Sequence, residues 1–445
     1  METSTFTRRA VLRAIGAAGL AGVAAAVTGC APTIGTAALP RIPAAYDGPP
    51  VRLKFWNGLT GGDGPVMREL LAEFTREHPN VRIDMYALPW PDFYQKFPAA
   101  VTSGLAPDFA LMHNFQVATN AARKVIMPVD EILQTVGLRE EDYLPVVWGS
   151  GVYRDQRWSL PLDMWPDSLF YNRRVLERAG LDPDAPPADR AAYEHALDAL
   201  ASSGVRGHWL PAVDPQGVGR GFDSLLWQFG GEHYSGDGRA ATFAEQPGVD
   251  ALAWQQSLIR TGWSPRDVSG SDASMAFKND QNAFLWGGPG AFINDLGSVE
   301  GLDWDVAPLP RIGTEQAAFS GSHQFVVARQ PRFDADRLAA VVTFLGWILA
   351  NSTGWASAGP VPARLPVLDS PELAQMTAQS HVAGGVEHIR FYPLVPGIAE
   401  VQTSILYPAI GDALLSLGDP RAALETATTQ ASFLLQENAE KYGRA

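Results

Sequence analysis

Residues 151–181 read GVYRDQRWSLPLDMWPDSLFYNRRVLERAGL, and this stretch predicts a crossing between two elements of regular structure. Gln156–Pro161 is expected to form a short strand, and Ser168–Asn172 a second one. Arg173–Ala179 contains helix-forming residues, and the glycine that follows ends the predicted helix. Prolines bound Asp163–Pro166, and because proline fixes its own φ and restricts the preceding residue, we expect this segment to be irregular.

Strands and helices alternate in the chain before this crossing. The sequence predicts strands at Val51–Trp56, Asn80–Leu88 and Ala106–Met112. It predicts helices that begin at Pro65 and cover Phe93–Ser103. This order with short connections predicts a parallel α/β sheet. The loops at Asn57, Trp90 and His113–Asn114 would then lie at the carboxyl ends of the strands, where ligands of open α/β sheets bind.

The chain after the crossing continues the alternation. Trp304–Pro310 is expected to return to the first half of the chain, and Ser320–Val327 to form a strand there. Helices are predicted at Ala335–Ala350, Arg390–Gln402 and Ala422–Asn438.

The chain has 445 residues, a hydrophobic fraction of 46% and a formal net charge of −14. This length is sufficient for two or three domains with sizeable cores. The negative charge argues against nucleic-acid binding, which needs clustered Lys and Arg.

The N-terminus predicts export and lipidation. Thr7–Arg13 reads TRRAVLR and matches a twin-arginine signal, and Ala14–Val27 is an uncharged apolar run suited to a signal peptide. Val27–Cys30 resembles a bacterial lipobox, and Cys30 is the only cysteine. We therefore expect residues 1–29 to be a Tat-type lipoprotein signal peptide. Residues 30–50 would be a lipidated cysteine and flexible tether on the outer face of the cytoplasmic membrane.

The order of the motifs resembles extracellular solute-binding protein family 1, the carbohydrate-binding lipoproteins of ABC importers that include maltose-binding protein. The matching segments are TGGDG, FTREHP, PWPDFYQK, APD, LPLDMWPDSLFYN, FDSLLWQFGG and GPVPAR. The resemblance implies a two-lobed periplasmic-binding-protein fold of type II, each lobe a sheet flanked by helices, joined by several crossings. Lobe 1 would comprise residues 51–162 and 306–352, and lobe 2 residues 163–305 and 353–445.

Candidate site residues follow from the chemistry of a sugar, whose flat C–H faces suit aromatic rings and whose hydroxyls need polar partners. The stacking candidates are Trp165, Trp227 and Trp286, with Gly287 beside the last and Trp90 as a weaker choice. The polar candidates are Asn57, Asp63, His113, Asn114, Asp163, Ser322 and His323. The resemblance adds Arg390 as a cleft arginine, with Arg364 as its competitor.

The leading hypothesis is a monomeric receptor that closes over a carbohydrate and delivers it to a membrane permease with its ATPase, without catalysis, cofactor or metal. A glycerophosphodiester ligand is an alternative, in which tryptophans surround a quaternary ammonium and Arg390 holds the phosphate. An exported glycoside hydrolase would need two facing carboxylates about 5–9.5 Å apart, for which Asp163 and Asp63 could be proposed. A metal-binding protein is least favoured because the histidines do not cluster in the sequence.

Overall fold

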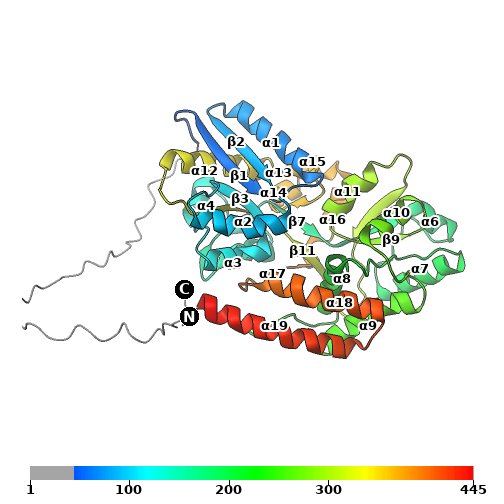
Figure 1. Ribbon diagram of the computed structural model, residues 1–445. Coiled ribbons are helices and arrows are strands. Elements are labelled where there is room, and N and C mark those ends of the chain that lie inside the picture. The colour runs from blue at the N-terminus through cyan, green and yellow to red at the C-terminus, as the bar shows by residue number, and fades with distance from the viewer. Residues whose placement is uncertain (1–44, 444–445) are drawn as a thin grey trace, which may run out of the picture. The chain divides into compact units, whose positions relative to one another are not determined.

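The computed structural model describes residues 45–443, and five strands form its first sheet in the order β2-β1-β3-β12-β6 (Figure 1). The strands are β1 Val51–Asn57, β2 Val81–Ala87, β3 Phe109–His113, β6 Leu160–Pro161 and β12 His323–Val327. β1 pairs in parallel with β2 and β3, as the alternating pattern predicted. β12 pairs antiparallel with β3, so a segment far along the chain completes this sheet.

Short connections link the first sheet to helices close to the predicted positions. The helices are α1 Asp63–Glu77, α2 Trp90–Thr102, α3 Val117–Ala122, α4 Asp130–Val136, α5 Pro145–Gly149, α12 Ala335–Ala350 and α13 Ser352–Ala356, with 3₁₀ turns η1 Asn114–Gln116 and η2 Glu140–Asp142. α1 and α2 begin two and three residues before the predicted starts. Asp63 suits the first turn of α1, where the helix dipole favours a carboxylate, and Pro91 suits the first turn of α2.

A three-stranded sheet contains β8 Ser168–Asn172, β9 Phe284–Gly287 and β10 Trp304–Pro308 in the order β10-β8-β9. The predicted return of Trp304–Pro310 to the first half is wrong for this strand. β10 pairs antiparallel with β8, with Trp304 opposite Asn172 and Pro308 opposite Ser168. The return is made by β12 instead.

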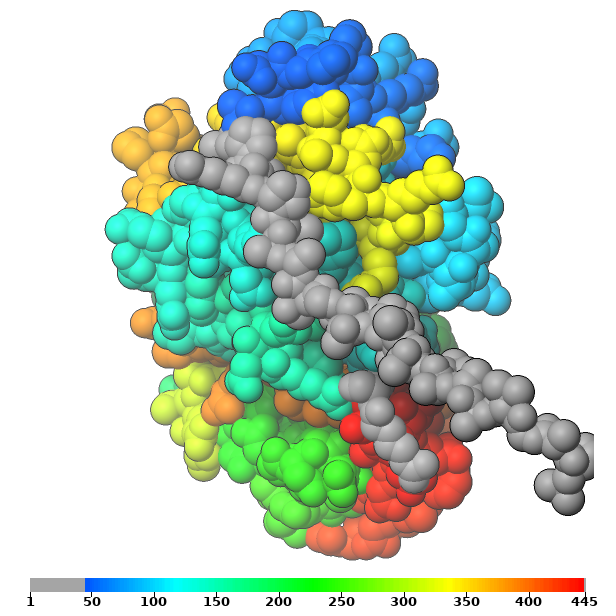
Figure 2. Space-filling model, turned by 90° about the vertical axis from the view of Figure 1, so that its left-hand side faces the viewer, coloured from blue at the N-terminus to red at the C-terminus, as the bar shows by residue number. Residues whose placement is uncertain are grey.

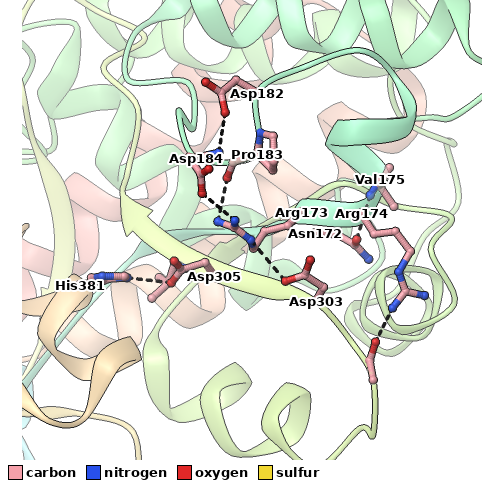
Figure 3. A network of polar contacts seen from close by, with 12 residues as sticks. Asn172, Arg173, Arg174, Val175, Asp182, Pro183, Asp184, Asp303, Asp305 and His381 are labelled. Carbon is pink, nitrogen blue, oxygen red and sulfur yellow. Dashed lines mark hydrogen bonds and ion pairs between the residues drawn. The ribbon is translucent and has the colours of Figure 1, made fainter.

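Polar contacts fix the corner between β8, β10 and helix α6, Arg173–Arg178 (Figure 3). The Asn172 side chain accepts a hydrogen bond from the Val175 amide at 3.0 Å and so caps α6. Arg173 is within ion-pair distance of Asp184, at 2.6 Å, and of Asp303, at 3.3 Å. The corner therefore holds the strand that follows the crossing in one orientation.

The segment predicted to be irregular, Asp163–Pro166, is strand β7, which corrects that expectation. It belongs to a four-stranded sheet in the order β13-β7-β11-β14. Its partners are β11 Ala318–Gly321, β13 Val361–Pro362 and β14 Ile389–Arg390. Pro166 is the last residue of β7, where the missing N–H interrupts little of the ladder. Arg390, predicted to begin a helix, lies in β14.

The predicted strand Gln156–Pro161 is also divided, because β4 Val152–Tyr153 and β5 Gln156–Arg157 form a separate hairpin before β6.

The remaining helices surround the three- and four-stranded sheets. They are α7 Arg190–Ser202, α8 Pro215–Gln228, α9 Gln246–Arg260, α10 Gly270–Lys278, α11 Pro289–Gly297, α14 Leu365–Leu368, α15 Pro371–Ala374, α16 Thr377–Ala383, α17 Ile398–Val401, α18 Tyr407–Ser416 and α19 Pro420–Gly443, with η3 Val386–His388 and the π-helical turn η4 Gln402–Leu406. Phe222, Trp254 and Leu414 belong to the large apolar core that α8, α9, α18 and α19 share. α8 thereby gains a buried face and a second face that is free to line a site.

Chain segments that are distant in sequence lie together in the space-filling view (Figure 2). The blue and cyan residues of the first strands and helices lie beside the yellow residues around α12, and the green and red residues gather below them. This grouping agrees with the strand order, in which β12 joins the first sheet while β7, β8 and β11 belong to the others. The limits of the two lobes remain a prediction.

Within residues 45–443, no helix combines the length and the apolar composition that crossing a membrane requires.

Candidate functional site

A cavity of about 560 Å³ lies between elements of the five-stranded sheet and elements of the four-stranded sheet. α2, β3, η1 and α3 contribute one side, and α8, β11, η4 and the start of α18 contribute the other. We call it the aromatic cavity, after its aromatic lining residues Trp90, Tyr94, Phe115, Phe319, Tyr392 and Tyr407. Its volume falls in the usual range of small-molecule sites.

Trp90, Tyr94 and His113 form one wall of the aromatic cavity. The Trp90 ring stacks on Tyr94 with centroids 5.6 Å apart and lies 4.2 Å from the His113 ring. Burial, together with the charges of His323 and Arg220, lowers the pKa of His113 well below its usual value, so its ring is neutral near pH 7. The Tyr94 hydroxyl lies 2.7 Å from Nδ1 of His113, and burial keeps that hydroxyl protonated by raising its pKa. The hydroxyl also accepts the His113 backbone N–H at 3.2 Å, and in the tautomer in which it donates to Nδ1 the Nε2–H of His113 is a donor at this wall.

The opposite wall rests on a buried carboxylate, Asp223 of α8. Its side chain accepts hydrogen bonds from the hydroxyls of Tyr392 and Tyr407, the latter at 2.7 Å, and lies 2.6 Å from Nε2 of His233. Burial raises the pKa of both tyrosines well above 10, so they remain donors. Three donors therefore satisfy Asp223, and the two tyrosine rings are held at the cavity wall.

Arg220, also on α8, is the half-buried cation of this wall. Its guanidinium carbon lies 5.1 Å from the ring centroid of Trp165 and 5.9 Å from that of Phe319. Both distances are within the range of cation–π attraction. The two rings therefore hold the arginine against the aromatic cavity.

A second buried carboxylate joins the strands that cross between the sheets. Asp163 of β7 accepts the His323 amide at 2.7 Å and the Trp355 indole N–H at 2.7 Å, and it lies 2.6 Å from Nδ1 of His323. Burial of His323 opposes its protonation. The charge of Asp163, the hydrogen bond to it and the charge of Asp63 together outweigh burial and raise the pKa of His323. Asp163 thus ties β7 to β12 and α13.

Two predicted site residues, Trp90 and His113, line the aromatic cavity. Trp165 lies directly behind it, under Arg220, and is only 7% exposed. The other predicted polar residues of the crossing have partners within the protein. Asn114 accepts the Ser322 amide at 3.2 Å, and the Ser322 hydroxyl accepts from Gln324 at 2.8 Å.

None of the four residues Asp163, Asn114, Ser322 and His323 lines the aromatic cavity. Each makes hydrogen bonds within the protein that join the strands, and their role as ligand partners stays a prediction. The Asn57 side chain accepts the Leu59 amide at 3.0 Å and shapes the loop after β1. Asp63 is half-buried at the start of α1, where burial raises its pKa, and it too lies outside the aromatic cavity.

The structure places the remaining candidates elsewhere. Trp227 is 2% exposed in the core, and its N–H lies 3.2 Å from Glu232. Trp286 stacks on Trp254 at 5.4 Å beside a separate cavity of about 40 Å³, and Gly287 follows it in β9. Arg390 forms ion pairs with Glu232, at 3.3 Å, and Glu315, at 3.7 Å. Loop position predicts that a residue is near a site, but packing decides which way its side chain points.

Arg364, the competitor of Arg390, binds Asp142 at 3.1 Å and also lies outside the aromatic cavity. The predicted lipidation site, Cys30, lies outside the described residues.

Sequence reasoning missed Tyr94, Arg220, Tyr392 and Tyr407. Tyr94 follows Trp90 by one helical turn, so the helical period could have indicated it. Arg220 lies between Gly219 and Gly221, just before the apolar segment FDSLLWQFGG, and that segment alone indicated the helix. Tyr392 lies within Arg390–Gln402, which was predicted to be helical, and Tyr407 lies beyond that range.

Glycines allow three rings to approach the backbone closely. A Cβ at Gly58 would lie 2.0 Å from Trp90, one at Gly219 would lie 2.0 Å from Tyr407, and one at Gly321 would lie 1.8 Å from Trp165. Each distance is far shorter than a van der Waals contact. Only glycine therefore permits these ring positions.

Replacing Gly321 with alanine is expected to lower the free energy of unfolding by about 1–3 kcal/mol, because the added methyl group displaces the Trp165 ring. Urea unfolding followed by tryptophan fluorescence measures the change. Gly236→Ala is the matched control, since nothing lies within 4 Å of its Cβ position, and it should change stability by less than about 0.5 kcal/mol. Equal stability of the two variants would contradict the expectation.

The architecture, sheets flanked by helices with the aromatic cavity between them, is the two-lobed fold of type II periplasmic binding proteins. Solved structures with this fold include the sugar-binding protein MalE from Xanthomonas citri, with a TM-score of 0.76 and 18% identity over 89% of this chain and 100% of that one. Another is the cyclic alpha-maltosyl-1,6-maltose binding protein from Arthrobacter globiformis, with a TM-score of 0.73 and 22% identity over 87% of this chain and 100% of that one. UgpB from Mycobacterium tuberculosis, solved with glycerophosphocholine, has a TM-score of 0.75 and 18% identity over 88% of this chain and 99% of that one.

The chain belongs to the bacterial extracellular solute-binding protein family, whose model matches residues 57–354. The sn-glycerol-3-phosphate-binding periplasmic protein UgpB of Shigella dysenteriae is 29% identical over 321 residues, which are 68% of this chain and 72% of that protein. The protein of the same name in Pectobacterium atrosepticum is 28% identical over 159 residues, which are 35% of this chain and only 36% of its own length. The resemblance noted in the sequence is thus confirmed at the level of family and fold.

Proposed function

We propose that this protein is the substrate-binding lipoprotein of an ABC importer and that it captures a carbohydrate in the aromatic cavity. The observation that carries the proposal is the composition of that cavity. Six aromatic residues from both sides surround a volume of about 560 Å³, and polar groups such as His113 and Arg220 lie among them. Aromatic rings bury the C–H faces of a sugar, while the polar groups pair with its hydroxyls.

Closure of the two lobes couples binding to transport in this proposal. The chain crosses between the sheets at β6–β7 and at β11–β12, within three residues each time. Ligand contacts from both sides of the aromatic cavity stabilise the closed form, because only in that form can the ligand contact both lobes at once. The closed form would then bind a permease, whose ATPase drives import.

The proposal places the protein outside the cytoplasmic membrane as a monomer. The family is described as one of extracellular solute-binding proteins, which supports this location. The twin-arginine motif and Cys30 support a lipid anchor, for which two acyl chains would be sufficient.

A glycerophosphodiester is the second candidate ligand. The guanidinium of Arg220 favours it, because it makes no hydrogen bond or ion pair to residues 45–443 and a guanidinium binds phosphate oxygens well. The UgpB relatives, named for binding sn-glycerol-3-phosphate, lend it further support.

A glycoside hydrolase is not supported. Asp163 is buried, and its carboxylate accepts hydrogen bonds from the His323 amide and the Trp355 indole N–H. Glu400 is the only carboxylate among the described residues that line the aromatic cavity. The two facing carboxylates of that mechanism are therefore not provided there.

Calorimetric titration of the purified chain tests the function. The panel contains maltose, maltotriose, trehalose, D-glucuronate, sn-glycerol 3-phosphate and glycerophosphocholine, with L-glutamine and zinc chloride as controls. We expect at least one hydroxyl-rich compound to bind with a dissociation constant of about 10 µM or lower, corresponding to roughly 7 kcal/mol. Binding of glutamine or zinc alone, or of no compound, would contradict the proposal.

A further inference from the structure

Arg220 differs from the other arginines that are half or more buried, because its guanidinium has no hydrogen bond or ion pair to the described residues. By contrast, Arg337 makes two hydrogen bonds to Asp108, and Arg157 donates to the Trp148 carbonyl at 2.9 Å. Arg364 binds Asp142 at 3.1 Å. Arginine carries five N–H donors, and a buried donor without a partner is costly. Arg220 therefore has its donors available at the wall of the aromatic cavity.

Two aromatic rings flank the guanidinium of Arg220. The rings of Trp165 and Phe319 lie 5.1 and 5.9 Å from its guanidinium carbon, so the side chain is held by its planar group. Rings at this distance stabilise the cation without using its N–H donors. The arrangement fits a residue that binds a ligand better than one that joins two parts of the fold.

Two buried carboxylates near Arg220, those of Asp223 and Asp167, make no ion pair with its guanidinium, and Glu400 also lines the aromatic cavity. Asp223, one helical turn along α8, already accepts from Tyr392, Tyr407 and His233. Burial raises the pKa of Asp167 to about 7, although the charge of Arg220 opposes that shift. Asp167 is therefore only partly ionised near neutral pH, so it offsets the charge of Arg220 only in part.

Resting on the proposed function, we propose that Arg220, and not Arg390, selects a polyol that carries one anionic oxygen group, either a phosphodiester or a carboxylate. The anionic group pairs with the guanidinium edge, and the hydroxyl-bearing remainder packs between Trp90, Tyr94 and the facing rings. The hydroxyls of a neutral sugar can accept hydrogen bonds from this guanidinium, but they do not neutralise its charge, so an anionic group pairs with it more strongly. Arg390 is already paired with Glu232 and Glu315 outside the aromatic cavity.

The test compares Arg220→Met and Arg220→Lys with the matched control Arg390→Met. Each purified chain is titrated with maltose, D-glucuronate, sn-glycerol 3-phosphate and glycerophosphocholine at low and high NaCl. We expect an anionic probe to bind the unaltered chain, more weakly at high salt. Its affinity should fall about 100-fold or more in Arg220→Met and less in Arg220→Lys, which keeps the charge but not the planar fork. Arg390→Met should stay within about threefold of the unaltered chain.

The probes distinguish the two sources of the anionic group, since glucuronate carries a carboxylate and glycerophosphocholine a phosphodiester. Binding of maltose alone would overturn the role of Arg220 and leave the proposed function intact. An anionic probe that binds Arg220→Met as tightly as the unaltered chain would also overturn it. If no probe binds the unaltered chain, the proposed function fails and the inference fails with it. Should Arg220→Met not fold, Arg220→Lys decides the outcome: a loss of about tenfold for an anionic probe supports the role of the planar fork, and unchanged affinity overturns it.

Discussion

Replacing Asp163 with asparagine is expected to lower the free energy of unfolding by about 3–5 kcal/mol, because one partner of a buried charge pair is removed. Asp163 is fully buried and accepts from the His323 amide, the His323 ring and the Trp355 indole. The amide group of asparagine would place a donor where two donors already point. Urea unfolding followed by circular dichroism measures the loss.

The matched control is Asp305→Asn. Asp305 makes the same kind of contact, 2.7 Å from Nδ1 of His381, but those two side chains are 22% and 44% exposed. An exposed pair contributes about 0–1 kcal/mol, so this variant should remain close to the unaltered chain. The interpretation of Asp163 is wrong if the two variants lose equal stability.

The loss in Asp163→Asn should also depend on pH. The folded protein raises the pKa of His323 above its ordinary value of 6.5. The pair therefore contributes its full stability below about pH 6.5 and loses it as the pH rises through the folded pKa. The difference between the variant and the unaltered chain should shrink in that direction.

Asp167→Asn is expected to have the opposite effect and to stabilise the protein by about 2–4 kcal/mol near pH 8. Asp167 is 3% exposed, and burial, opposed by Arg220 and reinforced by Asp223, raises its pKa from 3.8 to about 7. The folded state thus binds this proton more tightly than the unfolded chain does. Stability falls as the pH rises from about 4 to about 7, and the full cost is present above that range.

Unfolding free energies at about pH 5 and about pH 8 check this prediction. The unaltered chain should lose stability between the two values, and Asp167→Asn should lose less. Asp184→Asn serves as the control, because that carboxylate is 77% exposed, and its effect should be within about 0.5 kcal/mol at both pH values. A constant difference between Asp167→Asn and the unaltered chain at both pH values would contradict a titrating Asp167.

The sequence predicted the first sheet well because its strands are separated by clear helical periods and short loops. β1, β2 and β3 pair as that alternation requires. It failed at Asp163–Pro166, where local proline chemistry suggested an irregular segment. Pairing with β11 and β13, which lie far along the chain, makes this segment a strand. Local preference could not reveal these partners.

The candidate site was predicted only in part for a related reason. Trp90 follows β2 and His113 ends β3, so the topology alone brings them to the carboxyl edge of the first sheet. Trp227 is on the same helix as Arg220, seven residues later, yet it packs into the core. Which face of α8 meets the aromatic cavity depends on its packing against α9 and α18, and no single segment of sequence contains that information.

The close approach of Gly58, Gly219 and Gly321 to three rings has a consequence for binding thermodynamics. Rings pressed against the backbone have few other rotamers available, so the site is already ordered before the ligand arrives. Little side-chain conformational entropy is then lost when the ligand binds, and preorganisation of this kind increases affinity without adding a contact.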